Sequence, residues 1–580
     1  MPQHNAGASH SIRSARLTAW SRLGRSEENR GEELASRFSL LSPNHLLPTH
    51  LFPSPLCFWP KVGYNSLMIH IETRVRLPFL WGKAAFKKSN WTQVNLIVGP
   101  NGSGKTLLAN EIATQFRNYD LDVAFLRSDR IPEDQVLAVL RNNQQVKERI
   151  ESVLSGMFGK SITFREREDG SFVPMVVNRA RGVEYNLKEG ECHGLKEILQ
   201  LLIALYNSQG DCLIFDEPEL HLHPQFQLFF MKEIRKAAAE EPGKIFFLIT
   251  HSPFFIDLRF PEDLMGVIVC HVNRVPTHID QLAAEDELLF RRFLPRFNTY
   301  HKQFFFSDNQ IFVEGYTDQQ LFSHLLELTD SWYASVGTGI IDVGGKDELG
   351  VFCKVCSLLG TDGRIVGDLD SLFKGKLRDV VCQDPRPALW LQRKEEKQLP
   401  FYTQLFSPAS LKRGITLEKL ITRLERYLVD LGNVLWRLDG AAVPAEVAAL
   451  VEKLREMYDK HQKVEDLDTF KTVVLQGVNN VGHLLPSLIP SHLAATIPLI
   501  RNLASLIFAA AAAARVYILP KGCIEHYYTR NKVLYMPIAG KDRLFHTEQE
   551  YMTQVQPEVL RMEYRELIEI LNQACMRDSG

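Results

Sequence analysis

The chain has 580 residues, of which 45% are hydrophobic and 23% charged. These values are ordinary for a globular protein and exclude a disordered or fibrous one, and the length predicts several domains. Lysine plus arginine (67) nearly balances aspartate plus glutamate (69), so the net charge is −2 and any basic groove must be local. The nine cysteines are too sparse for a disulfide scaffold and favour a reducing, cytoplasmic compartment.

The first 67 residues contain a Pro- and His-rich stretch with neither helical nor strand periodicity. We expect residues 1–67 to form a poorly ordered N-terminal extension. Late in the chain, the uncharged stretch between Arg501 and Arg515 is shorter than the ~20 apolar residues of a membrane span. Because alanine dominates it, a packed helix is the better prediction, and we expect no membrane segment.

A glycine-rich loop, GPNGSGKT, lies between a short apolar run (94–98) and a helical pattern. Strand, loop and helix in this order are the context of a P-loop. The glycines let backbone N–H groups face a phosphate, the lysine adds positive charge, and the threonine hydroxyl can ligate Mg²⁺. The predicted ATP-binding residues are Gly99, Pro100, Asn101, Gly102, Ser103, Gly104, Lys105 and Thr106.

Two further motifs complete the expected nucleotide site. DCLIFDEPELHLHP brings Asp216 and Glu217 to the end of a buried strand, where ligands of parallel sheets lie. We expect Asp216 to bind Mg²⁺ and Glu217 to polarise the attacking water as a general base. KIFFLITHSP ends a second strand at His251, which would sense the γ-phosphate. His221 and His223 are interpreted as part of a turn, since no third zinc ligand is nearby.

These motifs resemble the ATP-binding-cassette type of ATPase, in the branch shared by SMC-like proteins and OLD-family (overcoming lysogenization defect) nucleases. In that branch, ATP is sandwiched between the P-loop of one copy and a signature helix of another. The matching segment is EGECHGLKEILQLLIAL (189–205), which departs from the usual LSGGQ-like signature. The resemblance implies contacts in trans from His193 and Gly194, and a homodimer or higher homo-oligomer through the ATPase domains. Only about 80 residues separate Thr106 from Gly190, too few for a long coiled-coil arm.

Acidic residues follow the predicted strands of the second half. Glu314 ends one strand and Asp318 follows on the first turn of a helix; a later strand runs into Asp368 and Asp370. Strands that alternate with helices predict a parallel sheet, at whose C-terminal edge these carboxylates converge. Clustered carboxylates call for a counter-charge, and oxygen ligands favour Mg²⁺ or Mn²⁺ over zinc.

The pattern of a glutamate followed by DxD resembles the Toprim domain of topoisomerases, primases and OLD nucleases. The resemblance implies that Lys346 faces the scissile phosphate or a leaving oxygen, and that Lys521 is the family's late basic residue. It also implies a set of metal ligands at the strand ends. These are Glu314, Asp318, Asp368, Asp370 and Glu525, in addition to Thr106 and Asp216 at the nucleotide.

Between the two parts of the Toprim pattern, apolar residues recur at helical spacing. We predict an α/β chain in which an ABC-type ATPase domain precedes a Toprim domain with a helical insertion. The expected boundaries are 68–300 for the ATPase domain, 305–400 for the first Toprim part, 405–510 for the insertion and 511–580 for the Toprim completion and C-terminal helix. The insertion is a lid, a dimer contact or a substrate-facing module.

The resemblance implies an ATP-hydrolysing endonuclease that cleaves nucleic-acid phosphodiesters with Mg²⁺ or Mn²⁺, in anti-phage defence. DNA is the expected substrate, although Toprim chemistry does not need the 2′-OH and an RNA target stays open. A second alternative is an ATPase sensor or scaffold whose Toprim half binds nucleic acid or a partner without cleaving. Several basic residues are candidates for a phosphate track: Lys302, Lys374, Lys376, Arg378, Lys394 and Lys397.

Overall fold

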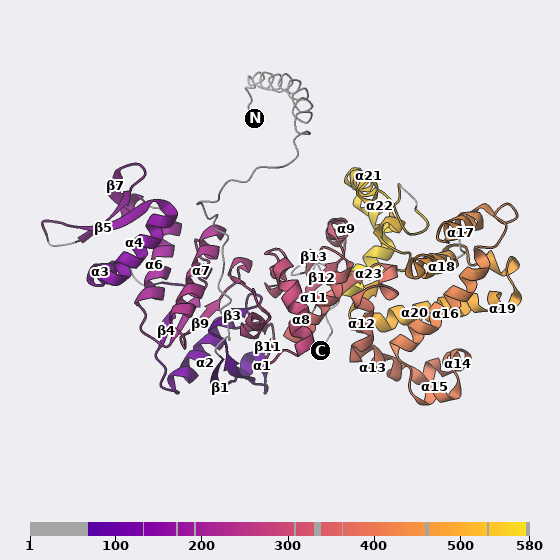
Figure 1. Cartoon of the computed structure of the whole chain (residues 1–580), viewed down its shortest axis with the longest axis horizontal. Helices are drawn as coiled ribbons and strands as arrows, with labels where there is room; N and C mark the ends of the chain where they lie inside the picture. The colour runs from indigo at the N-terminus through magenta and orange to yellow at the C-terminus, as the bar shows by residue number, and fades with distance from the viewer. Residues whose placement is uncertain are drawn as a thin grey trace, which may run out of the picture. The chain divides into compact units, whose positions relative to one another are not determined.

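The computed structural model describes residues 68–130, 133–169, 172–190, 193–306, 309–329, 338–361, 363–458, 463–530 and 533–575. The expected N-terminal extension, residues 1–67, lies outside this part of the chain. The described residues form a mixed α/β structure with two mainly parallel sheets, as the sequence predicts (Figure 1).

A six-stranded sheet carries the nucleotide motifs. Its strand order is β11-β10-β3-β9-β8-β4, and every pair is parallel except β10 with β11. Helices cover both faces, which explains why its central strands are mostly apolar. The strands are β3 (Val94–Val98), β4 (Val123–Leu126), β8 (Cys212–Asp216), β9 (Ile245–Ile249), β10 (Val267–His271) and β11 (Arg274–His278).

Alternation along β3 shows how the two faces are filled, since successive side chains of a strand point to opposite sides. Ile97 packs into a cluster with α2 (Lys105–Arg117). Leu96 and Val98 belong to the cluster that contains the buried residues of α7 (Pro224–Glu240). The P-loop is therefore attached to a strand that is held on both faces.

Smaller elements surround this sheet. The antiparallel pair β1 with β2 packs with α2 on one face of the six-stranded sheet. A three-stranded antiparallel sheet, β5-β6-β7, lies with the helices of the other face. The elements are β1 (Ile69–Val75), α1 (Pro78–Trp81), β2 (Phe86–Trp91), α3 (Glu133–Asn142), α4 (Gln144–Phe158), β5 (Lys160–Glu166), β6 (Phe172–Asn178), β7 (Val183–Asn186), α5 (Leu187–Gly190), α6 (His193–Asn207) and α8 (Ala284–Phe293).

A second sheet has four parallel strands in the order β13-β12-β14-β15. Its first three strands alternate with helices in the order that the sequence predicts. The elements are β12 (Asn309–Val313), α9 (Tyr316–Glu327), β13 (Thr338–Asp342), α11 (Lys346–Leu359), β14 (Gly363–Gly367), α12 (Lys376–Gln383) and β15 (Val516–Ile518).

Between α12 and β15 the chain is helical. Helix α16 packs against α18 and α20, and α20 returns the chain to β15. The helices are α13 (Pro385–Arg393), α14 (Glu395–Leu405), α15 (Pro408–Lys412), α16 (Leu417–Leu435), α17 (Ala445–Glu456), α18 (Leu467–Val481), α19 (Ser491–Ala494) and α20 (Thr496–Ala513).

One stretch among the described residues, Ser491–Ala513, is long and apolar enough to cross a membrane by length and composition. Core helices of soluble proteins pass the same test. Ile500, Leu503 and Ile507 of α20 are fully buried within the protein. They belong to the same apolar cluster as the buried face of α16, which is the packing expected of a core helix.

The C-terminal segment completes the second sheet. It contains a short 3-10 turn (Ile524–Tyr527), then α21 (Lys541–Gln554), α22 (Pro557–Glu563) and α23 (Arg565–Cys575). Helix α23 packs against α9, β12 and β14. Leu567 and Leu571 of α23 share an apolar cluster with Val313 and Leu321. The last helix therefore holds the strand and helix that flank Glu314.

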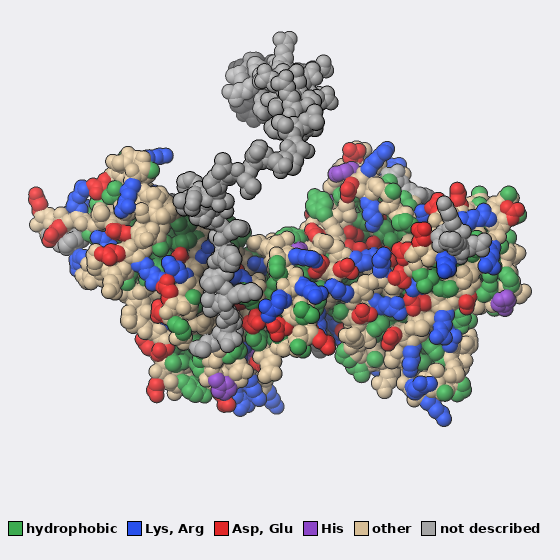
Figure 2. Space-filling view, in the orientation of Figure 1, with side chains coloured by type: hydrophobic (Ala, Val, Ile, Leu, Met, Phe, Trp, Pro, Cys, Tyr) green, Lys and Arg blue, Asp and Glu red, His purple; other side chains and the backbone are tan. Residues whose placement is uncertain are grey.

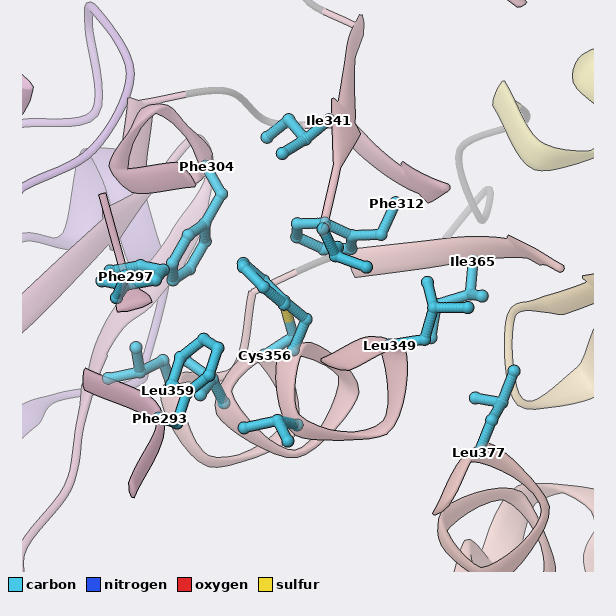
Figure 3. Close-up of a cluster of buried hydrophobic side chains, with 14 of the residues drawn as sticks. Phe293, Phe297, Phe304, Phe312, Ile341, Leu349, Cys356, Leu359, Ile365 and Leu377 are labelled. Carbon is cyan, nitrogen blue, oxygen red and sulfur yellow. The ribbon is translucent and has the colours of Figure 1, made fainter. Parts of the chain in front are cut away.

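The two sheets are joined by a cluster of aromatic side chains. Phe293 of α8 and Phe297, near the end of the ATPase half, pack with Phe304, Phe312 and residues of α11 (Figure 3). Cys356 of α11 is buried in this cluster. A short junction segment therefore packs directly against the second sheet.

Candidate functional sites

The P-loop has the backbone that its glycines allow. Gly99, Gly102 and Gly104 all have positive φ, at 139°, 76° and 82°. A Cβ on Gly99 would lie only 2.2 Å from the carbonyl oxygen of Cys270, so no other residue fits there. The loop thus passes close to β10 before α2 begins at Lys105.

Lys105 and Thr106 lie where the loop enters the helix. The ammonium of Lys105 donates to the carbonyl oxygens of Gly99 (3.0 Å) and Pro100 (2.9 Å), and burial lowers the pKa of this lysine. The hydroxyl of Thr106 is 3.2 Å from Oδ1 of Asp216. The structure therefore brings together the lysine, the threonine and the strand-end aspartate that the sequence assigns to one nucleotide.

Glu217 follows Asp216 in an unusual backbone conformation, with φ of 48°. Its Oε1 lies 3.8 Å from Nε2 of His251 at the end of β9. Burial, and then the charge of Lys105, lower the pKa of His251, which favours a neutral imidazole. Glu217 and His251 thus face each other at the edge of the sheet from which the P-loop emerges.

Glu219 was not singled out from the sequence. Its carboxylate accepts hydrogen bonds from the Thr250 hydroxyl and the His251 backbone N–H. Burial raises the pKa of Glu219. It therefore fastens the turn after β8 to the end of β9, which sets the spacing between Glu217 and His251. A second acid in the DEPE sequence is the only signal that could have marked it.

The predicted trans contacts, His193 and Gly194, begin α6. A Cβ on Gly194 would lie 3.1 Å from the carbonyl oxygen of His221, and the rings of His193 and His221 are 5.9 Å apart. Both residues therefore lie beside the HLHP turn of their own chain. His223, the other histidine of that turn, accepts a hydrogen bond from the backbone of Gln225 and caps α7.

In the second sheet, three carboxylates meet at the ends of β12 and β14. Ligand atoms of Glu314, Asp368 and Asp370 all lie within 4.8 Å of one another. Asp368 is 5% exposed, and burial followed by repulsion from Glu314 and Asp318 raises its pKa well above the usual range. So close a set of buried carboxylates fits a bound divalent cation.

Lys346 provides a positive charge at the same place. It begins α11, donates a hydrogen bond to Asp370, and its Nζ lies 3.7 Å from Oε1 of Glu314. Burial alone would lower the pKa of Lys346, but the charges of Glu314 and Asp370 outweigh it and the pKa is raised. The ammonium therefore stays protonated beside the carboxylates.

Asp318 and Glu525 are near this cluster but are not members of its closest group. Burial, and then repulsion from Glu314 and Glu525, raise the pKa of Asp318 to about 7. Glu525 is 1% exposed, and its Oε2 has no hydrogen-bond partner among the described residues. An unpaired buried carboxylate oxygen is costly, so this atom also fits a cation ligand.

Two late lysines form ion pairs with different acids, and the sequence analysis singled out only Lys521. Lys521, the expected late basic residue, forms an ion pair with Glu566 at 2.6 Å. Lys541 instead lies with its Nζ 3.2 Å from Oε1 of Glu525. Lys541 begins a helix 16 positions after Glu525, and no local pattern links the two residues.

The basic residues of the candidate phosphate track have different surroundings in the fold. Arg378 forms two hydrogen bonds with Glu425, and Lys374 lies 3.5 Å from Asp466. Lys376 has no ion-pair partner among the described residues. It lines a groove of about 320 Å³ between α8 and α11, together with Arg292 and Arg296. Figure 2 shows lysine and arginine side chains over this region, interspersed with acidic ones.

Two family models match the chain at these sites. The model described as "Overcoming lysogenization defect protein-like, TOPRIM domain" matches residues 305–370, which include Glu314, Lys346 and the DxD pair. A model described as an AAA domain, putative AbiEii toxin, matches residues 158–257, which include Asp216, Glu217 and His251. These matches support an OLD-family ATPase–Toprim fusion. The fold class and the resemblance inferred from the sequence are thereby confirmed.

Two curated relatives agree with this assignment. An OLD nuclease of Thermus scotoductus is 31% identical over 194 residues, which are 32% of this chain and 34% of the relative. Endonuclease GajA of Bacillus cereus is 25% identical over 192 residues, 28% of this chain and 27% of the relative. The matches therefore span about a third of the first relative and about a quarter of the second.

Solved structures resemble this chain only weakly. One titled RNase-L Inhibitor is 15% identical, covers 40% of this chain and 42% of its own, and has a TM-score of 0.25. Similarity at this level supports no conclusion about function.

Proposed function

We propose that this OLD-family protein is an ATP-hydrolysing endonuclease that cleaves nucleic-acid phosphodiesters at its Toprim half. The proximity of Glu314, Asp368 and Asp370, with Lys346 beside them, is the observation that carries the proposal. The names of the two relatives, OLD nuclease and endonuclease, support it. We further propose a cytoplasmic role in defence against phage, with DNA as the first substrate to test.

The carboxylates would hold the catalytic cation. Glu314, Asp368 and Asp370, with Asp318 and Glu525 close by, offer only oxygen ligands, which suit Mg²⁺ or Mn²⁺. A divalent cation bound there would polarise a phosphodiester and lower the pKa of a water molecule. Their burial excludes bulk water from the ligands and strengthens every electrostatic interaction among them.

Lys346 has a separate role in this proposal. Its ammonium is held at the strand ends by Asp370 and Glu314, on the first turn of α11. From there it would stabilise negative charge on the phosphate or on the leaving oxygen, as preorganised cations do in phosphoryl transfer. Its raised pKa keeps the charge in place at neutral pH.

The ATPase half would supply the control. Lys105 is expected to leave the carbonyl oxygens of Gly99 and Pro100 and bind the phosphates of ATP, while Thr106 and Asp216 hold Mg²⁺. Glu217 would orient the attacking water, and His251 would contact the γ-phosphate. ATP bound between the ATPase domains of two copies, with His193 and Gly194 in trans, would change how the Toprim halves are paired.

The groove lined by Lys376, Arg292 and Arg296 is the proposed path of the nucleic-acid strand. The groove lies near the carboxylate cluster along the chain, because Gly375 precedes Lys376 and approaches Lys346. A Cβ on Gly375 would lie 3.7 Å from Cγ of Lys346. Glu348 offsets part of the positive charge because it pairs with Arg296. Arg292 and Lys376 are left to contact phosphates.

The deciding experiment measures cleavage of supercoiled plasmid, single-stranded DNA and bulk RNA. Each polymer is incubated with Mg²⁺ or Mn²⁺, with and without ATP, using wild-type protein and Glu314→Gln. Cutting by wild type alone supports the Toprim nuclease, and the polymer cut most rapidly identifies the substrate class. If wild type hydrolyses ATP and cuts nothing, the alternative of a sensor or scaffold with a binding-only Toprim half is favoured.

A further inference from the structure

A buried arginine connects the signature helix to the backbone of the hydrolytic residues. Arg130 lies shortly after β4, has φ of 57°, and its side chain is 8% exposed. Neither the P-loop nor the strand-end motifs include it. Its position deep in the ATPase half therefore needs a separate explanation.

The guanidinium of Arg130 makes hydrogen bonds to three different segments. It donates to the backbone carbonyl oxygens of Asp216 (2.9 Å) and Glu217 (2.7 Å) at the end of β8. It donates to the carbonyl of Arg127 in its own loop at 2.8 Å. Its Nε forms an ion pair with Glu197 of α6, which is also 8% exposed on its side chain.

The contact with Glu217 acts on a strained residue. A positive φ of 48° is unfavourable for a glutamate and persists only where the surrounding structure holds it. Arg130 supplies that restraint, because it donates to the carbonyl oxygens of the peptide bonds before and after Glu217. The direction of the Glu217 side chain, 3.8 Å from His251, therefore depends on Arg130.

The contact with Glu197 links Arg130 to helix α6. Glu197 lies four residues after His193, one helical turn along α6, so the two side chains share a face of the helix. Both also line a cavity of about 150 Å³ with His221. A second copy that engages the start of α6 would therefore shift a helix whose buried carboxylate is joined to Arg130.

We infer that Arg130 is a positioning residue that transmits the placement of α6 to Glu217, so that hydrolysis accelerates when a second copy engages α6. This inference rests on the proposed ATPase function and adds a means of regulation to it. Arginine suits this role, because its planar guanidinium group can donate hydrogen bonds to two carbonyl oxygens and one carboxylate at the same time. Arg130 itself does not touch the substrate in this scheme.

The test measures ATP affinity and ATP turnover separately, as a function of protein concentration. Glu197→Gln keeps the shape of the side chain and removes the charge, while Arg130→Gln removes the relay itself. Glu287→Gln is the matched control, because Glu287 forms its ion pair with Arg291 inside α8 of the same ATPase half. Thermal melting reports whether each variant is folded.

We expect Arg130→Gln to bind ATP within twofold of wild type and to lose about 100-fold in kcat, the cost of misplacing a catalytic group. Glu197→Gln should keep ATP binding and its basal turnover, and lose the rise in turnover with protein concentration. Arg130→Lys restores the charge without the two carbonyl contacts, so it should not rescue kcat. The double variant should be no slower than Arg130→Gln alone.

Several outcomes overturn the inference. One is a kcat of Arg130→Gln equal to that of Glu287→Gln, or a turnover of Glu197→Gln that rises with protein concentration as the turnover of Glu287→Gln does. Another is a kcat of Arg130→Lys equal to that of wild type, which would show that only the positive charge of Arg130 matters and not its contacts with the two carbonyl oxygens. If Arg130→Gln does not fold, Glu197→Gln decides alone. Failure of the proposed ATPase is distinguishable, because wild type itself would then show no turnover.

Discussion

The ammonium of Lys541 lies 3.2 Å from Oε1 of Glu525, the acid placed just after β15. Lys521, which the resemblance implies as the late basic residue, pairs with Glu566 instead. Because Glu525 is buried and its second oxygen has no partner among the described residues, the pair belongs to the carboxylate-rich edge of the Toprim sheet. The chemistry of that edge therefore depends on a residue from the C-terminal helices.

Lys541→Ala should reduce nucleic-acid cleavage by roughly 10- to 100-fold, as loss of a group that orients a metal ligand does. Lys521→Ala is the matched control, since Lys521 pairs with Glu566 and should change cleavage little. Both variants should hydrolyse ATP like wild type. Equal cleavage rates for the two variants would show that Lys541 has no part in the site.

Lys105→Ala should lower ATP turnover by roughly 100-fold or more, because it removes the charge that binds the phosphates. The measurement is steady-state ATP hydrolysis, with binding of a fluorescent ATP analogue alongside. Thr114→Ala, on an exposed part of the same helix α2, serves as the control. Normal turnover by Lys105→Ala would contradict the P-loop assignment.

Asp368→Ala should abolish metal-dependent cleavage and leave ATP hydrolysis intact, since Asp368 belongs to the second sheet. Cleavage and ATP turnover are measured on the same preparation. Loss of both activities would indicate misfolding or tight coupling of the halves, which a thermal melt separates. Undiminished cleavage would remove Asp368 from the metal site.

Mn²⁺ should stabilise the folded protein without any substrate. At 100 times its dissociation constant, a ligand that binds only the folded state adds about 2.7 kcal/mol to the free energy of unfolding. We expect the melting temperature of Lys105→Ala to rise with Mn²⁺ as that of wild type does. The rise should be much smaller in Glu314→Gln, which lacks a ligand of the carboxylate cluster. An equal rise in both variants would place the ion elsewhere.

Replacing both Arg292 and Lys376 by alanine should weaken nucleic-acid binding and flatten its salt dependence. Each lost phosphate contact is expected to reduce the slope of log K against log[salt] by about 1. Binding is measured with Glu314→Gln as the background, so that the polymer stays intact. Lys397→Ala, an exposed lysine that does not line the groove, should leave the slope unchanged. A slope that the double variant does not alter would exclude the groove as the path.

Contiguous motifs could be read from the sequence. GPNGSGKT, DE after β8 and the DxD after β14 each depend on a strand, a tight turn and a helix within a few residues, so local patterns predict them. The order of strands and helices also places Glu314 and Asp368 at one sheet edge, because parallel strands share their C-terminal end. The assignment of α20 as a packed helix followed from its composition.

The choice of ion-pair partners was decided only by the tertiary structure. Arg378 is neutralised by Glu425 while Lys376 is not, and Lys541 rather than Lys521 reaches Glu525. Arg130 likewise meets Glu197 and the end of β8 across long stretches of chain. These contacts join residues 16 to 87 positions apart, up to the Arg130–Glu217 contact, and packing brings them together. A motif depends on local backbone geometry, but a charge pairs with whichever partner the packed helices bring near.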